Sequence, residues 1–183
     1  MSATHVVLIR GINVGGKNPV PMARLRGGLQ DAGLTQVRTY IQSGNALVWA
    51  PDLDEAAVNQ TVEHVLAALF DVHTVVVTVT AATLRRALDA APEGFGDDLV
   101  TYHCDVAFLR QGLGSEEALA AFGIREGVDE AWAGDGVVYF RRASALRAKS
   151  RMSKVASSSA YKDMTIRNWN TSTTLARMLA DDQ

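Results

Sequence analysis

Cysteine is nearly absent from this chain of 183 residues, which contains Cys104 alone. A single cysteine excludes an internal disulfide and is typical of a protein from a reducing compartment. Long apolar runs are missing too, because no stretch approaches the roughly 20 apolar residues of a membrane span. The N-terminus also lacks a charged region followed by an apolar signal core. The sequence therefore predicts a soluble cytoplasmic protein with no membrane association.

Patterns that bind metals or perform nucleophilic catalysis are also missing. No two histidines have a spacing suited to a shared metal; they are His5, His64, His73 and His103. The G-x-S-x-G turn of α/β hydrolases is absent. Cys104 lies in an apolar stretch, where a lone cysteine is usually an inert core residue. We expect no metal and no cofactor, and no catalytic residue is identified.

The charge is small overall but unevenly distributed along the chain. The formal net charge is −2. Residues 89–135 are mainly acidic, whereas residues 141–167 carry eight basic side chains against the single acid Asp163. This basic segment could contact phosphates. It could also be solvated or neutralise the acidic segment, which is favoured because nucleic-acid binders usually carry a basic domain overall.

Residues 10–18 form a glycine-rich stretch directly after the apolar run 6–9, so we expect a loop that leaves the end of a buried strand. Its glycines let the backbone turn amide N–H groups towards a common point, and two cations lie in the same loop. The glycines and cations are Arg10, Gly11, Gly15, Gly16 and Lys17. This composition predicts an anion site.

The nearest named pattern is the phosphate-binding P-loop, G-x-x-x-x-G-K-[ST], and Gly11 to Lys17 satisfies its spacing. Asn18, however, replaces the hydroxyl residue that holds magnesium. Pro19 and Pro21 prevent a helix with all its donors from starting at the lysine. A P-loop nucleotidase is therefore disfavoured. A looser set of backbone donors for phosphate or carboxylate, and a purely structural glycine turn, both stay open.

The first half of the chain alternates strand-like and helix-like segments. Strands are predicted at residues 5–9, 37–43, 45–49 and 74–80. One helix begins near Pro21 and ends at Gly33, and a second follows Asp52, which forms a capping-box pattern with Glu55. The order β-α-β-β-α-β is that of ferredoxin-like folds with an antiparallel sheet.

The second half repeats this pattern in a weaker form. A linking helix at 81–90 and an acidic loop at 92–98 come first. Strands follow at 101–109, 130–133, 137–141 and 165–167, with helices at 115–122, about 149–161 and 171–180. We predict an α+β protein with two subdomains, the first ferredoxin-like (βαββαβ, antiparallel sheet) and the second a degenerate βαββαβ. The predicted domains are 1–80, a linker at 81–98, and 99–183 with the terminal helix.

Polar side chains surround a tryptophan near the C-terminus, in the run Arg167-Asn168-Trp169-Asn170-Thr171. Asn170 or Thr171 is the natural N-cap of the last helix. Trp169 is interpreted as a core or interdomain anchor rather than a platform for base stacking. An arginine beside a helix N-terminus suits an anionic group, provided that the fold brings it to the first loop.

Topology brings the first loop and the middle hairpin together. In the predicted sheet, right-handed crossovers place both at one end, so two polar clusters become one candidate pocket. The predicted ligand-binding residues are Arg10, Asn13, Gly15, Gly16, Lys17, Asn18, Gln42, Ser43, Asn45, Arg167 and Asn168.

Three blocks of the sequence resemble one family. Residues 8–18, 40–45 and 167–171 are similar to the signature blocks of the bacterial family catalogued as domain of unknown function 1697. The resemblance covers nearly the whole chain, although residues 153–164 look more divergent. It implies a soluble bacterial α+β protein with a ferredoxin-like N-terminal half. It implies no activity, since the family has none assigned.

Three functional hypotheses follow. The first is binding of a phosphate-bearing ligand, a nucleotide or a nucleic-acid segment, at the glycine-rich loop. The second is an enzyme of acyl or phosphoryl transfer in the same pocket, which would need an activated acid, base or nucleophile; the blocks offer only amides, Ser43 and cations. The third is a protein-interaction module whose basic C-terminal segment docks an acidic partner or a second copy of the chain. The oligomeric state stays open.

Overall fold

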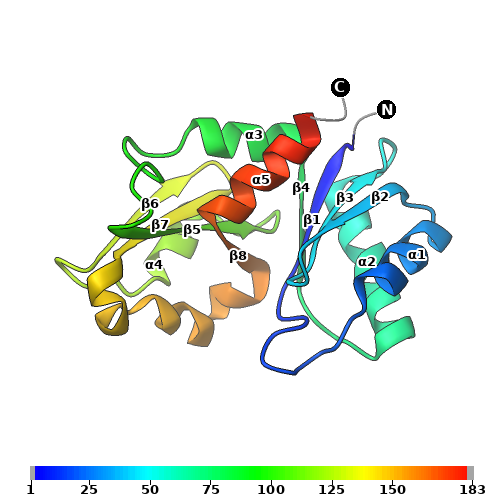
Figure 1. Cartoon of the computed structure of the whole chain (residues 1–183), viewed down its shortest axis with the longest axis horizontal. Coiled ribbons are helices and arrows are strands. Elements are labelled where there is room, and N and C mark those ends of the chain that lie inside the picture. Colours follow the sequence, from blue (N-terminus) through cyan, green and yellow to red (C-terminus); the bar gives the residue numbers. More distant parts are fainter. Residues whose placement is uncertain (1–2, 181–183) are drawn as a thin grey trace. The chain divides into compact units, whose positions relative to one another are not determined.

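The chain folds as two compact units, which the computed structural model describes for residues 3–180 (Figure 1). Of the described residues, one unit comprises 3–84 and 174–180, and the other comprises Arg85–Thr173. Each unit has its own four-stranded antiparallel sheet. The predicted α+β class with two related ferredoxin-like subdomains is therefore confirmed.

The first unit is built on a four-stranded sheet with β1 in its interior. Its elements are β1 (His5–Ile9), α1 (Met22–Asp31), β2 (Thr35–Tyr40), β3 (Asn45–Trp49), α2 (Glu55–Phe70) and β4 (Val76–Thr80). The strand order is β2-β3-β1-β4, and every neighbouring pair is antiparallel. This is the βαββαβ arrangement of ferredoxin-like folds. All five residues of β1 are buried, which explains why its sequence is apolar from Val6 to Ile9.

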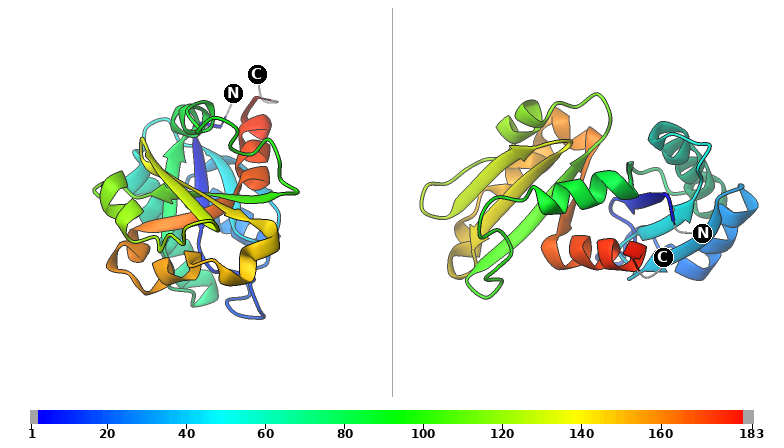
Figure 2. Two further views of the ribbon diagram at one scale, coloured as in Figure 1. Left: turned by 90° about the vertical axis from the view of Figure 1, so that its left-hand side faces the viewer. Right: turned by 90° about the horizontal axis from the view of Figure 1, so that it is seen from above.

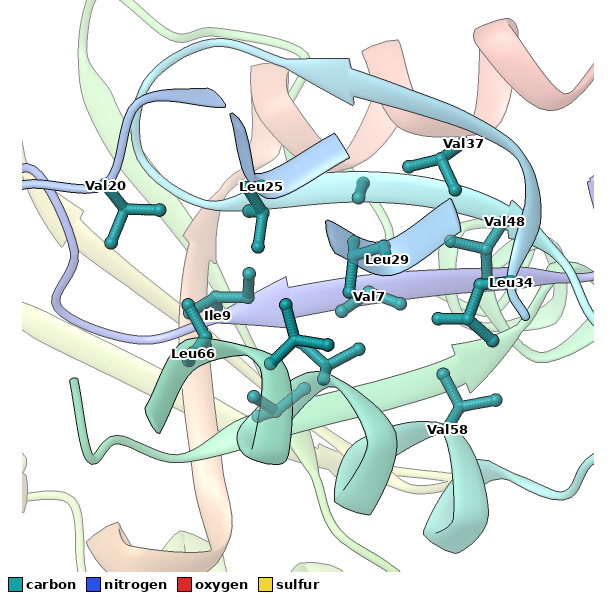
Figure 3. Packing of buried hydrophobic residues seen from close by; sticks show 14 of the residues in the cluster. Val7, Ile9, Val20, Leu25, Leu29, Leu34, Val37, Val48, Val58 and Leu66 are labelled. Atoms are coloured by element: carbon teal, nitrogen blue, oxygen red, sulfur yellow. The ribbon is translucent and has the colours of Figure 1, made fainter. Parts of the chain in front are cut away.

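Helices α1 and α2 pack on the same face of this sheet and form the core of the first unit (Figure 3). Leu25 and Leu29 of α1 and Val58 and Leu66 of α2 meet Val7 of β1 in one apolar cluster. On each helix the buried positions recur at intervals of three or four residues, so that one side faces the sheet. This packing fixes the ends of β1 and of the β2–β3 hairpin, where the candidate site lies.

Some element boundaries in the first unit differ from the prediction. β2 spans Thr35–Tyr40 rather than 37–43, because the chain turns at Ile41, where φ is +49°. β4 begins at Val76 rather than at 74. The predicted cap at Asp52 is wrong: Asp54 is the N-cap of α2, and its side chain accepts the amide of Ala57 at 2.8 Å.

The second unit repeats the same strand arrangement. Its elements are β5 (Tyr102–Leu109), α4 (Ser115–Ala120), β6 (Asp129–Gly134), β7 (Val137–Ala143) and β8 (Met164–Asn168). The order β6-β7-β5-β8 matches that of the first sheet, and all pairs are antiparallel. Helices α3 (Ala81–Asp89) and α5 (Trp169–Ala180) each contain a boundary between the units. No helix in residues 3–180 is long and apolar enough to cross a membrane.

The predicted helix at about 149–161 is wrong. Three short 3₁₀ helices take its place, η1 (Ser144–Lys149), η2 (Met152–Ser157) and η3 (Ser159–Asp163), drawn in gold and orange in Figure 2. Serine hydroxyls compete here for the carbonyls that a continuous α-helix would use. Ser157 Oγ donates to Lys154 O at 2.8 Å, and Ser158 Oγ donates to Val155 O at 2.7 Å. The second helix of the repeat is thus broken into turns.

Candidate functional site

The glycine-rich loop between β1 and α1 is a small hairpin. Asn13 N donates to Asn18 O and Lys17 N donates to Val14 O, each at 3.0 Å. Gly15 and Gly16 are the two central residues of the turn, with φ of +58° and +74°. Positive φ at both positions defines a type I′ turn, which explains the paired glycines. The loop therefore has a defined shape rather than being an open connection.

The side chain of Asn13 joins this hairpin to the rest of the first unit. Its Oδ1 accepts the amide of Val20 at 2.7 Å, and its Nδ2 donates to Val20 O at 2.8 Å. The same Nδ2 donates to Gln42 O, in the β2–β3 turn, at 2.9 Å. Asn13 is thus a clamp that ties the two ends of the loop to each other and to the neighbouring turn.

Asn18, which stands where a P-loop has its hydroxyl, has a different role in this loop. Its φ is +48°, and its Nδ2 donates to Gly11 O at 3.0 Å. Helix α1 begins only at Met22, after Pro21, so the loop does not lead into a helix at Lys17. The arrangement differs from a P-loop, as the sequence predicts.

The β2–β3 turn lies at the same end of the sheet as the loop (Figure 1). Ile9 N donates to Gly44 O at 2.7 Å, so the end of β1 is bonded directly to the turn. Asn45 is fully buried, and its Nδ2 donates to Tyr40 O at 3.2 Å and to Ser43 Oγ at 3.4 Å. The first loop and the residues Gln42, Ser43 and Asn45 are therefore adjacent, as the topology predicts.

Charge at the site comes from Arg10 and Lys17, which are held differently. The main chain of Arg10 is fixed by bonds from Arg10 N to Val75 O at 3.0 Å and from Thr74 Oγ1 to Arg10 O at 2.6 Å. Arg10 is half-buried, whereas Lys17 at the hairpin tip is exposed. Within residues 3–180, no acceptor is hydrogen-bonded to the amides of Gly15 and Gly16 beside it.

Two exposed apolar side chains that sequence reasoning did not single out lie at this edge. Val14 is 58% exposed and Ile41 is 49% exposed. They flank the Asn13–Gln42 hydrogen bond, since each precedes or follows one of its partners. Ile41 also has φ of +49°, which is strained for a β-branched residue. The position of Val14 next to the Gly15-Gly16 turn could have indicated its exposure, whereas nothing in the sequence pattern marks Ile41 as exposed.

Arg167 and Asn168 belong to the second unit, where each has a structural role. Arg167 on β8 is buried, and its Nη1 donates to Thr165 Oγ1 at 3.0 Å and to Ile166 O at 2.9 Å. Burial lowers the pKa of its guanidinium to about 10. Asn168 Oδ1 accepts the amide of Thr171 at 2.7 Å, so Asn168 caps α5 and the predicted caps, Asn170 or Thr171, are wrong. Their contribution to a ligand site stays a prediction.

Trp169 packs within the second unit. Its ring meets Phe95 edge to face at 5.2 Å, and Phe95 also contacts Trp132 and Tyr139. Asn168 and Trp169 also border a pocket of about 100 Å³, lined further by Leu99, Tyr102, His103, Cys104 and Asn170. Ligand pockets usually enclose about 300–1,000 Å³, so this one is too small for a nucleotide.

A buried carboxylate on β5, that of Asp105, lies close to two basic side chains. Asp105 Oδ1 lies 3.5 Å from His103 Nε2, and Oδ2 lies 3.4 Å from Arg142 Nη2. Burial raises the pKa of the Asp105 carboxyl, and the charges of His103 and Arg142 offset only part of this. Burial also raises the pKa of the Cys104 thiol, as befits an inert core cysteine. No group of three potential metal ligands gathers among residues 3–180.

The Asp105→Asn variant is expected to gain stability relative to wild type as pH rises. An acid whose pKa is raised by folding binds protons more tightly in the native protein than in the unfolded chain. Its contribution to the free energy of unfolding is therefore complete below the unfolded-state pKa and is lost as the pH rises through the folded-state pKa. The asparagine variant does not undergo this loss. Thermal unfolding of both proteins from pH 4 to pH 8 measures the difference, and a difference that stays constant with pH contradicts the assignment.

The fold and the loop together define a protein of two ferredoxin-like units, with a glycine-rich hairpin at one end of the first sheet. The family described as "Protein of unknown function (DUF1697)" matches residues 2–139, and the chain belongs to this family. The match includes the first two of the three sequence blocks. The resemblance stated from the sequence is therefore confirmed.

A solved structure shows the same architecture. Conserved bacterial protein SP0830 from Streptococcus pneumoniae shares 25% sequence identity with this chain, with a TM-score of 0.79. The alignment covers 98% of this chain and 99% of that one, so the likeness extends over both units. No curated protein matches the chain. These comparisons assign the family and the fold, and neither carries an activity or a ligand.

Proposed function

We propose that the first unit binds a small phosphate-bearing ligand, a nucleotide, at the tip of the β1–α1 hairpin. The observation that carries this proposal is the type I′ turn at Gly15 and Gly16. Its two amides have no acceptor among residues 3–180, and the exposed Lys17 follows directly. Backbone donors beside a cation are suited to the oxygens of a phosphate group.

The framework of the hairpin supports the proposal because the donors are already held in place. The amides of Asn13 and Asn18 bond to backbone groups within the loop and to the β2–β3 turn. A loop ordered before binding loses less conformational entropy when the ligand arrives. In this arrangement Lys17 and the two glycine amides hold the phosphate, while Asn13 and Asn18 keep the loop in shape.

The exposed apolar side chains favour a nucleotide over a free phosphate. Val14 and Ile41 leave 58% and 49% of their surface in water beside a polar site. A nucleotide base offers an apolar face that covers such side chains, and the exposed Gln42 can hydrogen-bond to its edge. Inorganic phosphate has no group that makes use of either feature.

An enzymatic use of the same pocket has less support. Ser43 is the candidate nucleophile at this edge, but its Oγ accepts a hydrogen bond from the Asn45 amide at 3.4 Å. A serine nucleophile needs a general base that takes the proton of its hydroxyl, and the Asn45 amide cannot serve as that base. Binding without catalysis is therefore the function that the geometry supports best.

Lys17→Ala is expected to weaken nucleotide binding at least tenfold, because it removes the charge beside the turn. AMP, ATP, pyrophosphate and inorganic phosphate are titrated against wild type, Lys17→Ala and Arg26→Ala by calorimetry and thermal unfolding. Arg26 is the matched control, an exposed cation on α1 of the same unit. At 100 times its Kd a ligand stabilises the wild type by about 2.7 kcal/mol, and Arg26→Ala should keep this gain. The proposal fails if no anion shifts the wild type, or if Lys17→Ala binds as tightly.

A further inference from the structure

A second candidate site lies in the other unit, around the buried side chain of Asp129 on β6. Asp129 is 3% exposed, and its Oδ2 accepts the amide of Arg125 at 3.1 Å and the amide of Arg151 at 3.0 Å. One carboxylate therefore holds together two segments that are distant in the sequence, the chain before β6 and the start of η2. Both of these segments carry cations.

Four cationic residues lie on the two segments that this carboxylate joins: Arg125, Lys149, Arg151 and Lys154. Arg125 Nη1 donates to Lys149 O at 3.1 Å. Gly123 lets the segments approach closely, since a Cβ there would lie 3.0 Å from Arg151 Cβ and 3.1 Å from Lys154 Cδ. All four residues are exposed. We call these four residues the basic surface.

Within the part of the chain that the structure describes, the cations of the basic surface are not ion-paired, unlike Arg141 and Arg142 on β7. Arg141 Nη2 lies 2.6 Å from Glu130 Oε2, and Arg142 lies against Asp105. None of the four surface residues forms an ion pair with a carboxylate within residues 3–180. The charge is therefore available to a partner, although the exposed Glu126 directly follows Arg125.

We propose that the basic surface binds the phosphate backbone of a nucleic acid. This site is independent of the glycine-rich hairpin and of the nucleotide proposed there. Protein partners are usually held through an apolar centre, and residues 144–163 carry no exposed large apolar side chain; Ile124 beside Arg125 is the nearest. Contact with a phosphate backbone needs cations and hydroxyls instead, and Ser153 and Ser157 are exposed on the same segment.

The expected binding is weak, independent of base sequence and sensitive to salt. Non-specific complexes of this kind have Kd values of roughly 10⁻⁴ to 10⁻⁶ M at physiological salt, and each neutralised phosphate adds about 0.9 to the slope of log Kd against log salt. The chain as a whole has a net charge of −2, so a complex that forms must use a local surface rather than the total charge.

Fluorescence anisotropy with a 20-nucleotide single-stranded RNA and a 20-base-pair DNA, from 25 to 200 mM KCl, tests the proposal on the full chain. The double variant Arg151→Gln/Lys154→Gln should bind at least tenfold more weakly, with a salt slope lower by about 2. The matched control Arg26→Gln/Arg177→Gln removes two exposed charges elsewhere and should change Kd less than twofold. Lys17→Ala should bind as the wild type does.

The Asp129→Ala variant distinguishes binding that depends on the arrangement of the basic surface from binding that depends on the net charge of the chain. This variant makes the chain more positive by one unit, so binding through total charge becomes tighter, whereas loss of the frame around Asp129 weakens it. Thermal unfolding checks that each variant is folded, and the double variant tests the proposal if Asp129→Ala is not. The proposal is overturned if the wild type binds neither nucleic acid at 25 mM KCl. It is also overturned if the control double variant or Lys17→Ala loses as much affinity as Arg151→Gln/Lys154→Gln. Binding of poly-L-glutamate as tight as that of nucleic acid would overturn it too, because it would indicate an acidic protein partner.

Discussion

Gly44→Ala is expected to lower the free energy of unfolding by about 3 kcal/mol, from the left-handed backbone and from overpacking. Gly44 has φ of +85°, and a Cβ there would lie 2.7 Å from the carbonyl oxygen of Ile9. That oxygen belongs to the backbone at the end of β1, which cannot rotate away as a side chain can. The bond from Ile9 N to Gly44 O should break, and the melting temperature should fall by roughly 6–12 °C.

Gly33→Ala is the control that measures the cost of a positive φ alone, without steric overlap. Gly33 has a similar φ, +93°. Among residues 3–180, no atom outside Gly33 and its chain neighbours lies within 4 Å of the position that an added methyl group would take, so its replacement should cost only about 1–2 kcal/mol. Urea and thermal unfolding of the two variants give the comparison. Equal losses would mean that the close approach of the β2–β3 turn to β1 is unimportant for stability.

Gly96→Ala is expected to have the other large effect, again a loss of about 3 kcal/mol. Gly96 has φ of +87°, and a Cβ there would overlap the indole ring of Trp169. The ring would have to leave its edge-to-face contact with Phe95. Near-ultraviolet circular dichroism should change along with stability, since it reports the packing of aromatic rings.

Gly94→Ala provides the matched control in the same loop. Its φ is +72°, but apart from its chain neighbours no residue that the structure describes comes within 4 Å of the added methyl group. We expect a loss of about 1–2 kcal/mol and an unchanged near-ultraviolet spectrum. If Gly94→Ala perturbs the spectrum as strongly as Gly96→Ala, the role given to Trp169 as an anchor within the second unit is wrong.

The order of strands and helices along the chain could be predicted because the relevant signals are local. The apolar run at β1 and the Gly134–Gly136 turn each mark an element within a few residues of chain. The helix caps could not be located as well. Asp52 and Asp54 carry the same side chain, and the choice between them depends on where the chain first enters the helix, which tertiary packing decides.

The adjacency of the first loop and the β2–β3 turn could be predicted, but the detail of their contacts could not. Topology placed the first loop beside the β2–β3 turn, and the Asn13–Gln42 hydrogen bond confirms that they are adjacent. The direction of the Asn13 amide depends on the carbonyls of Val20 and Gln42, which come from other segments. The serine-rich turns at 144–163 were missed because apolar spacing alone does not distinguish an α-helix from successive 3₁₀ turns.

The two halves of the chain differ in length where the first strand of each sheet passes into its first helix. In the second unit residues 110–114 suffice for this passage, whereas the first unit uses residues 10–21 for the same topological step. A ferredoxin-like unit can therefore form with the shorter strand-to-helix loop. A chimera that carries the shorter passage in both halves should still fold, and whatever it can no longer do is the contribution of those extra residues.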